Sequence, residues 1–219
     1  FLCPAPTVAQ SEPITVGSKP FGESFLLAEI FAQLLESRGL SVERRFGLGA
    51  TAIAFQALRT GAIDVYPEYT GTGLVALLNQ SPEGSAGDVF RIVSREFRER
   101  WGAHWLPPLG FENTYAIAVR TESAEADGLR TLSDLARVAD RYIGGFSPDF
   151  IGRSDGLPGL QSAYGIRVRE QRSLLPAVKY EALNSGEVDV VDGYSTDGRI
   201  ERYDFVVLED DLGFFPPSQ

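Results

Sequence analysis

The chain has 219 residues, enough for one large domain or for two small lobes with cores of their own. Apolar residues make up 43% and charged residues 23%, the ordinary profile of a soluble globular protein. A net charge of −10 argues against nucleic acid as a partner, because phosphates would be repelled. No run of about 18 apolar residues occurs, so no membrane-spanning helix is predicted.

The first ten residues are small, apolar and proline-containing, and the chain holds no methionine. They predict the tail of a signal peptide, with Thr7 and Ala9 as the small residues before a cleavage point; an ordinary disordered terminus is the alternative. Cys3 is the only cysteine, which excludes a disulfide framework and a cysteine metal site. Leu2 precedes it where a lipid anchor would want a small residue, so lipidation is disfavoured.

Strands and helices are predicted to alternate along the chain. Strands are expected at residues 14–17, 41–46, 62–66, 113–120, 142–146, 188–191 and 205–208. Helices are expected at residues 23–38, 50–60, 88–101, 132–138 and 173–185. Gly39 and Gly61 mark the ends of the first two helices, and Thr131 with Asp134 marks the start of the fourth. This alternation is typical of an α/β fold with a mostly parallel sheet.

One internal repeat indicates how the chain is organised. Residues 57–65 read Ala-Leu-Arg-Thr-Gly-Ala-Ile-Asp-Val, and residues 182–190 read Ala-Leu-Asn-Ser-Gly-Glu-Val-Asp-Val, an offset of 125 from 57 to 182. The offset continues into the next loop, where Tyr69 aligns with Tyr194. Each copy predicts a helix, a glycine stop, a buried strand and a tyrosine-bearing loop, as two similar α/β lobes would. The alternative is that the two segments are unrelated, because any helix–strand unit tends to have a helix, a glycine and then a strand.

The repeat indicates two lobes, and the family resemblance given below implies that a hinge with two crossings joins them. Residues 11–112 together with residues 205–219 are predicted to form the first lobe, and residues 113–204 the second. Residues 1–10 lie outside both. Ligands of open α/β sheets bind at the carboxyl ends of strands, so facing lobes would place Tyr69 and Tyr194 in one cleft.

Several segments, in order along the chain, resemble those of one protein family. They are residues 14–19 with Phe21, Glu23 and Ser24; residues 66–72; residues 113–115; Phe150 with residues 153–156; residues 192–197; and residues 215–217. Tyr66-Pro67-Glu68-Tyr69-Thr70-Gly71-Thr72 is the most specific of these segments. From about residue 14 to residue 217, the chain resembles the substrate-binding proteins of ABC importers for glycine betaine, proline betaine, choline and carnitine.

The resemblance implies the type II periplasmic-binding-protein fold, a permease partner, and a place on the periplasmic or extracellular face of the cytoplasmic membrane. No cofactor and no metal ion are implied. Members usually continue further and return to finish the first lobe, so the C-terminal part of that lobe is expected to be missing from this chain.

The resemblance also implies a ligand site. In the family, a box of tyrosines holds the cationic head of the ligand, and these positions fall on Tyr69, Tyr115 and Tyr194. Polar contacts to the ligand fall on Lys19, Thr72 and Asn113. The arginine that binds the ligand carboxylate falls on Arg153. The fourth wall of the box would follow Pro217, where this chain has Ser218, so one wall is expected to be absent.

The residue types suit a quaternary ammonium zwitterion. A trimethylammonium group has charge but no N–H, so aromatic faces select it better than hydrogen-bond acceptors do. A carboxylate suits the planar fork of donors that arginine offers. Each residue also has an ordinary interpretation: Arg153 could pair with Asp155, Lys19 could hold a loop, and His104, the only histidine, is predicted to be structural.

Three classes of function remain open. The leading hypothesis is an extracytoplasmic solute-binding protein of an ABC importer for a compatible solute such as glycine betaine. The second is a ligand-sensing or permease-fused domain for another zwitterion or amine, such as ergothioneine or choline. The third is an enzyme on the same scaffold, because fold alone does not fix function. The sequence offers no nucleophile–base motif for the third, so no enzyme is predicted.

Overall fold

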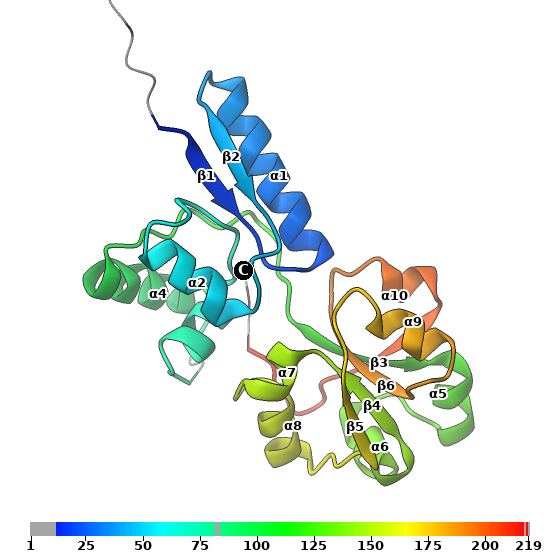
Figure 1. Ribbon diagram of the computed structural model, residues 1–219. Coiled ribbons are helices and arrows are strands. Elements are labelled where there is room, and N and C mark those ends of the chain that lie inside the picture. Colours follow the sequence, from blue (N-terminus) through cyan, green and yellow to red (C-terminus); the bar gives the residue numbers. More distant parts are fainter. Residues whose placement is uncertain (1–11, 82–83, 217, 219) are drawn as a thin grey trace, which may run out of the picture.

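The computed structural model describes residues 12–81, 84–216 and 218. In Figure 1 these residues form two α/β lobes, with β1, β2 and α1 in one and a larger sheet in the other. The predicted signal-peptide tail, including Cys3, lies outside the described residues. Among the described residues, no helix combines the length and the apolar character needed to cross a membrane.

The first lobe is built around a small parallel sheet of two strands. Its elements are β1 (Ile14–Gly17), α1 (Gly22–Ser37), β2 (Val42–Arg45), α2 (Thr51–Arg59), α3 (Thr70–Thr72), a π-helical turn (Gly73–Leu77) and α4 (Ala86–Trp101). The predicted helices at residues 23–38, 50–60 and 88–101 are confirmed as α1, α2 and α4. α4 begins with a capping box, in which Ser85 and Asp88 satisfy each other's backbone N–H groups.

The second lobe is built around a mixed sheet of five strands in the order β5-β4-β6-β3-β7. Its strands are β3 (Tyr115–Arg120), β4 (Ile143–Phe146), β5 (Glu170–Ser173), β6 (Val190–Tyr194) and β7 (Phe205–Leu208). Its helices are α5 (Thr121–Asp127), α6 (Leu132–Ala136), a 3₁₀ turn (Ala139–Arg141), α7 (Pro148–Gly152), α8 (Leu157–Tyr164), α9 (Lys179–Asn184) and α10 (Arg199–Arg202). The predicted start of α6 at Thr131 and Asp134 is confirmed as a capping box.

Both faces of the larger sheet are covered, and β3 shows how the sequence arranges this. Successive side chains of a strand point to opposite faces. Ile117 and Val119 pack into one core with α5, α6 and α8, whereas Ala116 and Ala118 pack into the other core with α9 and α10. The lobe is therefore a three-layer sandwich with its sheet in the middle.

Two local predictions are wrong. The segment at residues 62–66 is not a strand but makes a single bridge, from Val65 to Val16 of β1, because Pro67 lacks the N–H that would continue a ladder. The helix predicted at residues 173–185 begins only at Lys179, because Ser173 ends β5 and Pro176 disfavours helix before it. The strand predicted at residues 188–191 is shifted along the chain and reaches Tyr194.

The assignment of residues from Phe205 onward to the first lobe is wrong for β7. This strand pairs with β3 in the five-stranded sheet, with Leu208 opposite Ile117. β3 would otherwise be an edge with unpaired N–H and C=O groups. After β7 the described chain returns to the boundary between the lobes, where the backbone N–H of Asn113 donates to the carbonyl of Ser218 at 2.8 Å.

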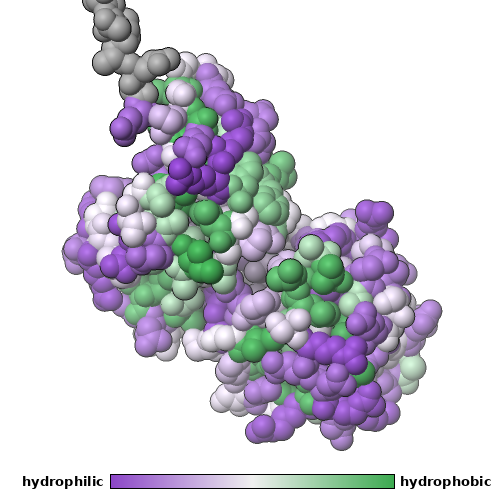
Figure 2. All heavy atoms as spheres, in the orientation of Figure 1, coloured by the Kyte–Doolittle hydropathy of each residue, from purple (hydrophilic) through white to green (hydrophobic). Residues whose placement is uncertain are grey.

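Part of the first lobe's apolar surface faces solvent. Leu26, Ile30 and Leu34 are 61%, 49% and 56% exposed, and their spacing of four residues aligns them along α1. Figure 2 shows hydrophobic side chains gathered on this lobe between more polar areas.

Candidate ligand-binding site

A small cavity between the lobes is lined by every residue that the sequence predicts for the site. The first lobe contributes Lys19, Tyr69 and Thr72. The second lobe contributes Tyr115, Arg153 and Tyr194. The crossing segments contribute Asn113 and Ser218. The cavity measures about 20 Å³, room for about one water molecule. A quaternary ammonium ligand is much larger, so the lobes must separate or the rings must move before one can bind.

Three tyrosine rings meet at this cavity for different structural reasons. Tyr69 caps the start of α3 in extended conformation and is 6% exposed. Tyr115 begins β3 and Tyr194 ends β6, and the two are direct partners in the antiparallel ladder. Their rings stack with centroids 5.5 Å apart and an interplanar angle of 18°. The register of the sheet thus produces a two-ring wall opposite the first lobe.

The tyrosines present neutral rings. Burial raises the pKa of Tyr115 and Tyr194 well above the usual range. Burial also raises the pKa of Tyr69, and the hydrogen bond from its hydroxyl to Glu23 adds to the effect. The side chains can therefore offer π faces to a cation rather than phenolate charge.

Arg153 lies in the cavity wall with its guanidinium held by a carboxylate from its own loop. Its Nε and Nη2 donate to Asp155 at 2.8 and 2.5 Å, and its Nη1 donates across the cleft to Thr72 at 3.2 Å. Burial opposes the charge, but the bonds to Asp155 outweigh it and keep the pKa above the usual value. The pairing with Asp155 considered from sequence alone is thus real, and it lies buried at the cleft.

Lys19 also forms an ion pair with a carboxylate. Its Nζ lies 2.5 Å from Glu68, and both side chains are almost fully buried. The same ammonium lies 5.4 Å from the ring centroid of Tyr69 and 5.6 Å from that of Phe21. The first lobe therefore already holds one cation against two aromatic faces.

Glu23, Phe21 and Asp155 are neighbours of the site that the sequence analysis did not predict as ligand-binding residues. Glu23 accepts from the Tyr69 hydroxyl and, at 2.7 Å, from Nδ2 of Asn113. Phe21 and Asp155 line the cavity itself. All three stand within the segments that carry the family resemblance, so the signal was their position in those motifs.

Two polar atoms at the cavity lack partners. Oδ1 of Asn113 and the hydroxyl of Tyr115 are buried and make no hydrogen bond among the described residues. Buried polar atoms in proteins nearly always have a partner. These atoms are therefore available to a bound molecule, one as an acceptor and the other as a donor.

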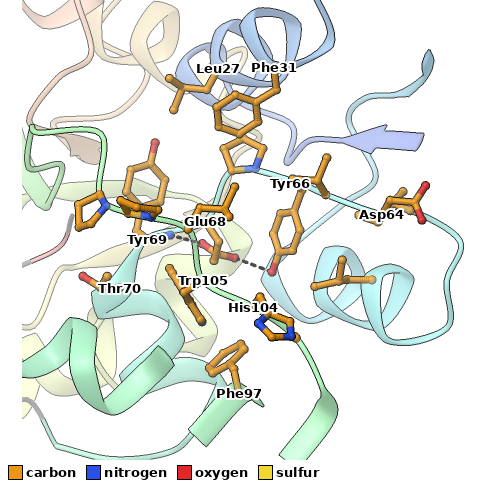
Figure 3. Close-up of a pocket in the computed structure, with 18 of the residues that line it drawn as sticks. Leu27, Phe31, Asp64, Tyr66, Glu68, Tyr69, Thr70, Phe97, His104 and Trp105 are labelled. Atoms are coloured by element: carbon orange, nitrogen blue, oxygen red, sulfur yellow. Dashed lines mark hydrogen bonds between the residues drawn. The ribbon is translucent and has the colours of Figure 1, made fainter. Parts of the chain in front are cut away.

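A larger cavity of about 610 Å³ lies within the first lobe, on the other side of Tyr69. Figure 3 shows its aromatic lining, with Phe31, Phe97 and Trp105 around a buried carboxylate. That carboxylate, Glu68, accepts from the Tyr66 hydroxyl at 3.2 Å and from the backbone N–H of Tyr69 at 2.9 Å. The candidate ligand site is nevertheless the smaller cavity, because only there do rings and cations from both lobes converge.

Two α/β lobes with the candidate site between them are the architecture of type II periplasmic binding proteins, and solved structures of that class match the chain. A glycine betaine/carnitine/choline ABC transporter structure has a TM-score of 0.68 and 30% identity, covering 94% of this chain and 77% of its own. A lactococcal protein in its closed form with glycine betaine has a TM-score of 0.60 at 14% identity, which supports the fold alone. The predicted fold class is confirmed.

Within this class, residues 12–219 match the family described as the substrate-binding domain of ABC-type glycine betaine transport systems, and the chain belongs to that family. It is 35% identical to a glycine-betaine-binding protein of Pseudomonas aeruginosa, over 95% of this chain and 70% of that protein. It is 34% identical to a carnitine transport binding protein of Listeria monocytogenes, over 95% and 69%. It is also 34% identical to an ergothioneine transport permease/ergothioneine-binding protein of Helicobacter pylori, over 96% of this chain but only 38% of that protein.

Proposed function

We propose that this chain captures a quaternary ammonium zwitterion such as glycine betaine between its two lobes and delivers it to the permease of an ABC importer. The observation that carries the proposal is the convergence of Tyr69, Tyr115 and Tyr194 with Arg153 on one interlobe cavity. Membership of the family supports the same conclusion.

The chemistry of the cavity matches the two ends of such a ligand. Each aromatic face contributes about 0.5–2 kcal/mol to binding a cation, more when water is excluded. The guanidinium of Arg153, 5.4 Å from the ring centroid of Tyr115, offers donors to a carboxylate. Three faces and one anion site together support a Kd on the order of micromolar.

Calorimetric titration of the purified chain tests this proposal. The ligands are glycine betaine, proline betaine, choline, carnitine and ergothioneine, with glycine as the control because it has a carboxylate but no methylated ammonium. We expect binding of at least one methylated zwitterion on the order of micromolar Kd and none of glycine. Failure to bind any of the methylated ligands would refute the proposal.

Ergothioneine is a second candidate, because Asn113, which lines the cavity, carries an unpaired acceptor. Oδ1 of Asn113 is buried without a partner, and the imidazole ring of ergothioneine carries an N–H that could satisfy it. Glycine betaine has no N–H. The similarity to the Helicobacter pylori protein supports this candidate. Tighter binding of ergothioneine than of glycine betaine in the same titration would favour it.

The proposed place of action is the extracytoplasmic face of the cytoplasmic membrane, which the family membership supports. Cell fractionation of the source organism tests this location, and co-purification with the permease tests the partner. We propose a receptor that releases its ligand unchanged. Mass spectrometry of the ligand after long incubation with the protein tests this point, and a chemically altered ligand would contradict it.

A further inference from the structure

Ser218 lines the cavity of the tyrosine cage and is buried at 7% exposure, but it carries no ring. Another aromatic residue lines the same cavity from the first lobe. Phe21 is 7% exposed, and its ring centroid lies 4.9 Å from that of Tyr194 and 6.4 Å from that of Tyr69. It therefore contacts one cage tyrosine from each lobe.

The backbone fixes the position of this ring. Phe21 caps the start of α1 in extended conformation, with φ −143° and ψ 157°. Its N–H donates to the carbonyl of Lys19 at 3.0 Å, and its carbonyl accepts from the N–H of Phe25 at 3.1 Å. Because both backbone groups are bonded, the ring is anchored by α1 and by the turn that leaves β1.

The ring already has a cation beside it. The Lys19 ammonium lies 5.6 Å from its centroid, within the range of cation–π attraction. Phenylalanine has no hydroxyl, so it presents this surface without needing a hydrogen-bond partner in the cleft.

We propose that Phe21 is the fourth aromatic wall of the cage and replaces the ring that Ser218 does not supply. The inference rests on the proposed function, because it assigns a residue to the same cation site. Since Phe21 belongs to the first lobe and touches Tyr194 of the second, the cage is complete only when the lobes are together. Phe21 thus contributes to selection of the cationic head of the ligand.

The test compares Phe21→Leu with wild-type protein, using glycine betaine and tert-butylacetate as probes. The second compound has the same shape but carries a carbon in place of the ammonium nitrogen, so it lacks the positive charge. We expect Phe21→Leu to raise the Kd for glycine betaine by about 2- to 30-fold, the range of one cation–π face. The Kd for tert-butylacetate divided by the Kd for glycine betaine should be smaller in Phe21→Leu than in wild type. A loss of packing alone would not cause this, because it would weaken both probes alike.

Phe25→Leu is the matched control, because Phe25 lies one helical turn away, is 39% exposed and does not line the cavity. Substitution of Phe21 by trifluorophenylalanine keeps the shape of the ring while weakening its face, and it should also raise the Kd for glycine betaine. This variant decides the matter if Phe21→Leu does not fold. If wild type binds glycine betaine but neither variant changes the ratio of the Kd values for tert-butylacetate and glycine betaine, the role of Phe21 is refuted while the proposed function stands. Absence of wild-type binding to any methylated ligand would overturn the proposed function with it.

Discussion

Arg153 and Asp155 together set the charge of one end of the cavity. The carboxylate takes two of the guanidinium's hydrogen bonds, and the Thr72 hydroxyl takes another. A ligand carboxylate must therefore share the guanidinium with Asp155. We expect this pair to favour zwitterions over simple cations, because only a ligand with a carboxylate could take hydrogen bonds from Arg153.

Arg153→Ala should weaken glycine betaine by about 2–5 kcal/mol, the cost of leaving a desolvated charge without its partner, while choline affinity changes little. Calorimetry with both ligands measures the difference. Because the single substitution leaves Asp155 buried and unpaired, the double variant Arg153→Ala, Asp155→Ala serves as the control for folding. Equal losses for both ligands would show that Arg153 holds the structure rather than the carboxylate.

We expect Glu23 to position the residues of the cage. It accepts from the hydroxyl of Tyr69 and from the side-chain amide of Asn113, so it links a wall of the first lobe to the crossing segment. Glu23→Ala should weaken glycine betaine by about 1–3 kcal/mol, because both donors would lose a buried acceptor. Glu23→Gln keeps an acceptor oxygen and should restore most of that affinity.

Glu29→Ala is the matched control for Glu23, because Glu29 lies further along α1 and bonds to Arg44 on the surface. Titration with glycine betaine and thermal unfolding of each variant separate binding from folding. If Glu23→Ala and Glu29→Ala had the same affinity as wild type, Glu23 would have no part in positioning the cage.

At the scale of elements, the start of α2 shows how the two lobes hold each other. Its cap residue, Ala50, has no side chain that can accept a hydrogen bond. Asp149 of α7 in the other lobe lies within reach instead, with Oδ2 3.4 Å from the backbone N–H and 3.3 Å from the hydroxyl of Thr51. A carboxylate at a helix N-terminus also interacts favourably with the helix dipole. The second lobe thus caps a helix of the first.

Asp149→Ala should weaken ligand binding by about 0.5–2 kcal/mol, the usual value of a helix N-cap. The effect arises because this contact exists only when the lobes are together, so its loss disfavours the closed form. Asp149→Asn should bind nearly as wild type, since asparagine caps helices equally well. Measured Kd values for glycine betaine that are equal in all three proteins would contradict the capping role.

Elements with local signals could be predicted from the sequence. α1, α2, α4 and α6 have apolar spacing, and their limits are marked by residues such as Gly39, Gly61 and Thr131. The bridge at Val65 and the sheet position of β7 depend instead on partners far along the chain, which single-segment patterns do not contain. For β7, pairing with a distant strand overrode the local interpretation, whereas at Val65 the expected pairing stops after one bridge.

In the site, too, some features could be predicted from the sequence and others depend on the fold. Its eight predicted residues lie on one cavity because family motifs identify positions without requiring the fold. The roles of Phe21 and Glu23 depend on which ring or amide the folded chain brings beside them. Likewise, the stacking of Tyr115 on Tyr194 follows from the register of β3 against β6, which the sequence alone does not specify.

At the scale of the whole molecule, the chain passes from the first lobe to the second near Asn113, and residues 216 and 218 lie beside this passage. Asn113 bonds to Ser218 there, and the Thr114 hydroxyl donates to the carbonyl of Pro216 at 3.4 Å. A short hinge of this kind allows one lobe to rotate against the other as a rigid body. The site residues next to this hinge, Asn113 and Ser218, would move least as the cleft opens.

The size of the site requires that the lobes separate or that the rings move before a ligand can enter. A cavity of about 20 Å³ is far below the roughly 300–1,000 Å³ typical of small-molecule sites. The contacts that close it, between Phe21 and Tyr194 and between Arg153 and Thr72, join the two lobes. Ligand binding is therefore coupled to an equilibrium between open and closed forms, and the measured affinity depends on how the ligand shifts it.

We expect the unliganded protein to populate an open form and saturating glycine betaine to narrow the ensemble to a closed one. Single-molecule energy transfer can follow this with dyes on Glu99→Cys in α4 and Glu201→Cys in α10, both exposed and in different lobes, in a Cys3→Ser background. The Asp149→Ala variant should have a larger open population than wild type without ligand. It should still close when saturated with ligand, because the ligand makes contacts to both lobes.

A pair of dyes within the second lobe, on Glu125→Cys and Glu201→Cys, controls for effects of ligand on the dyes themselves. The distribution of interlobe distances should differ with and without a ligand that binds in calorimetry. If it does not differ, the rings move while the lobes stay fixed.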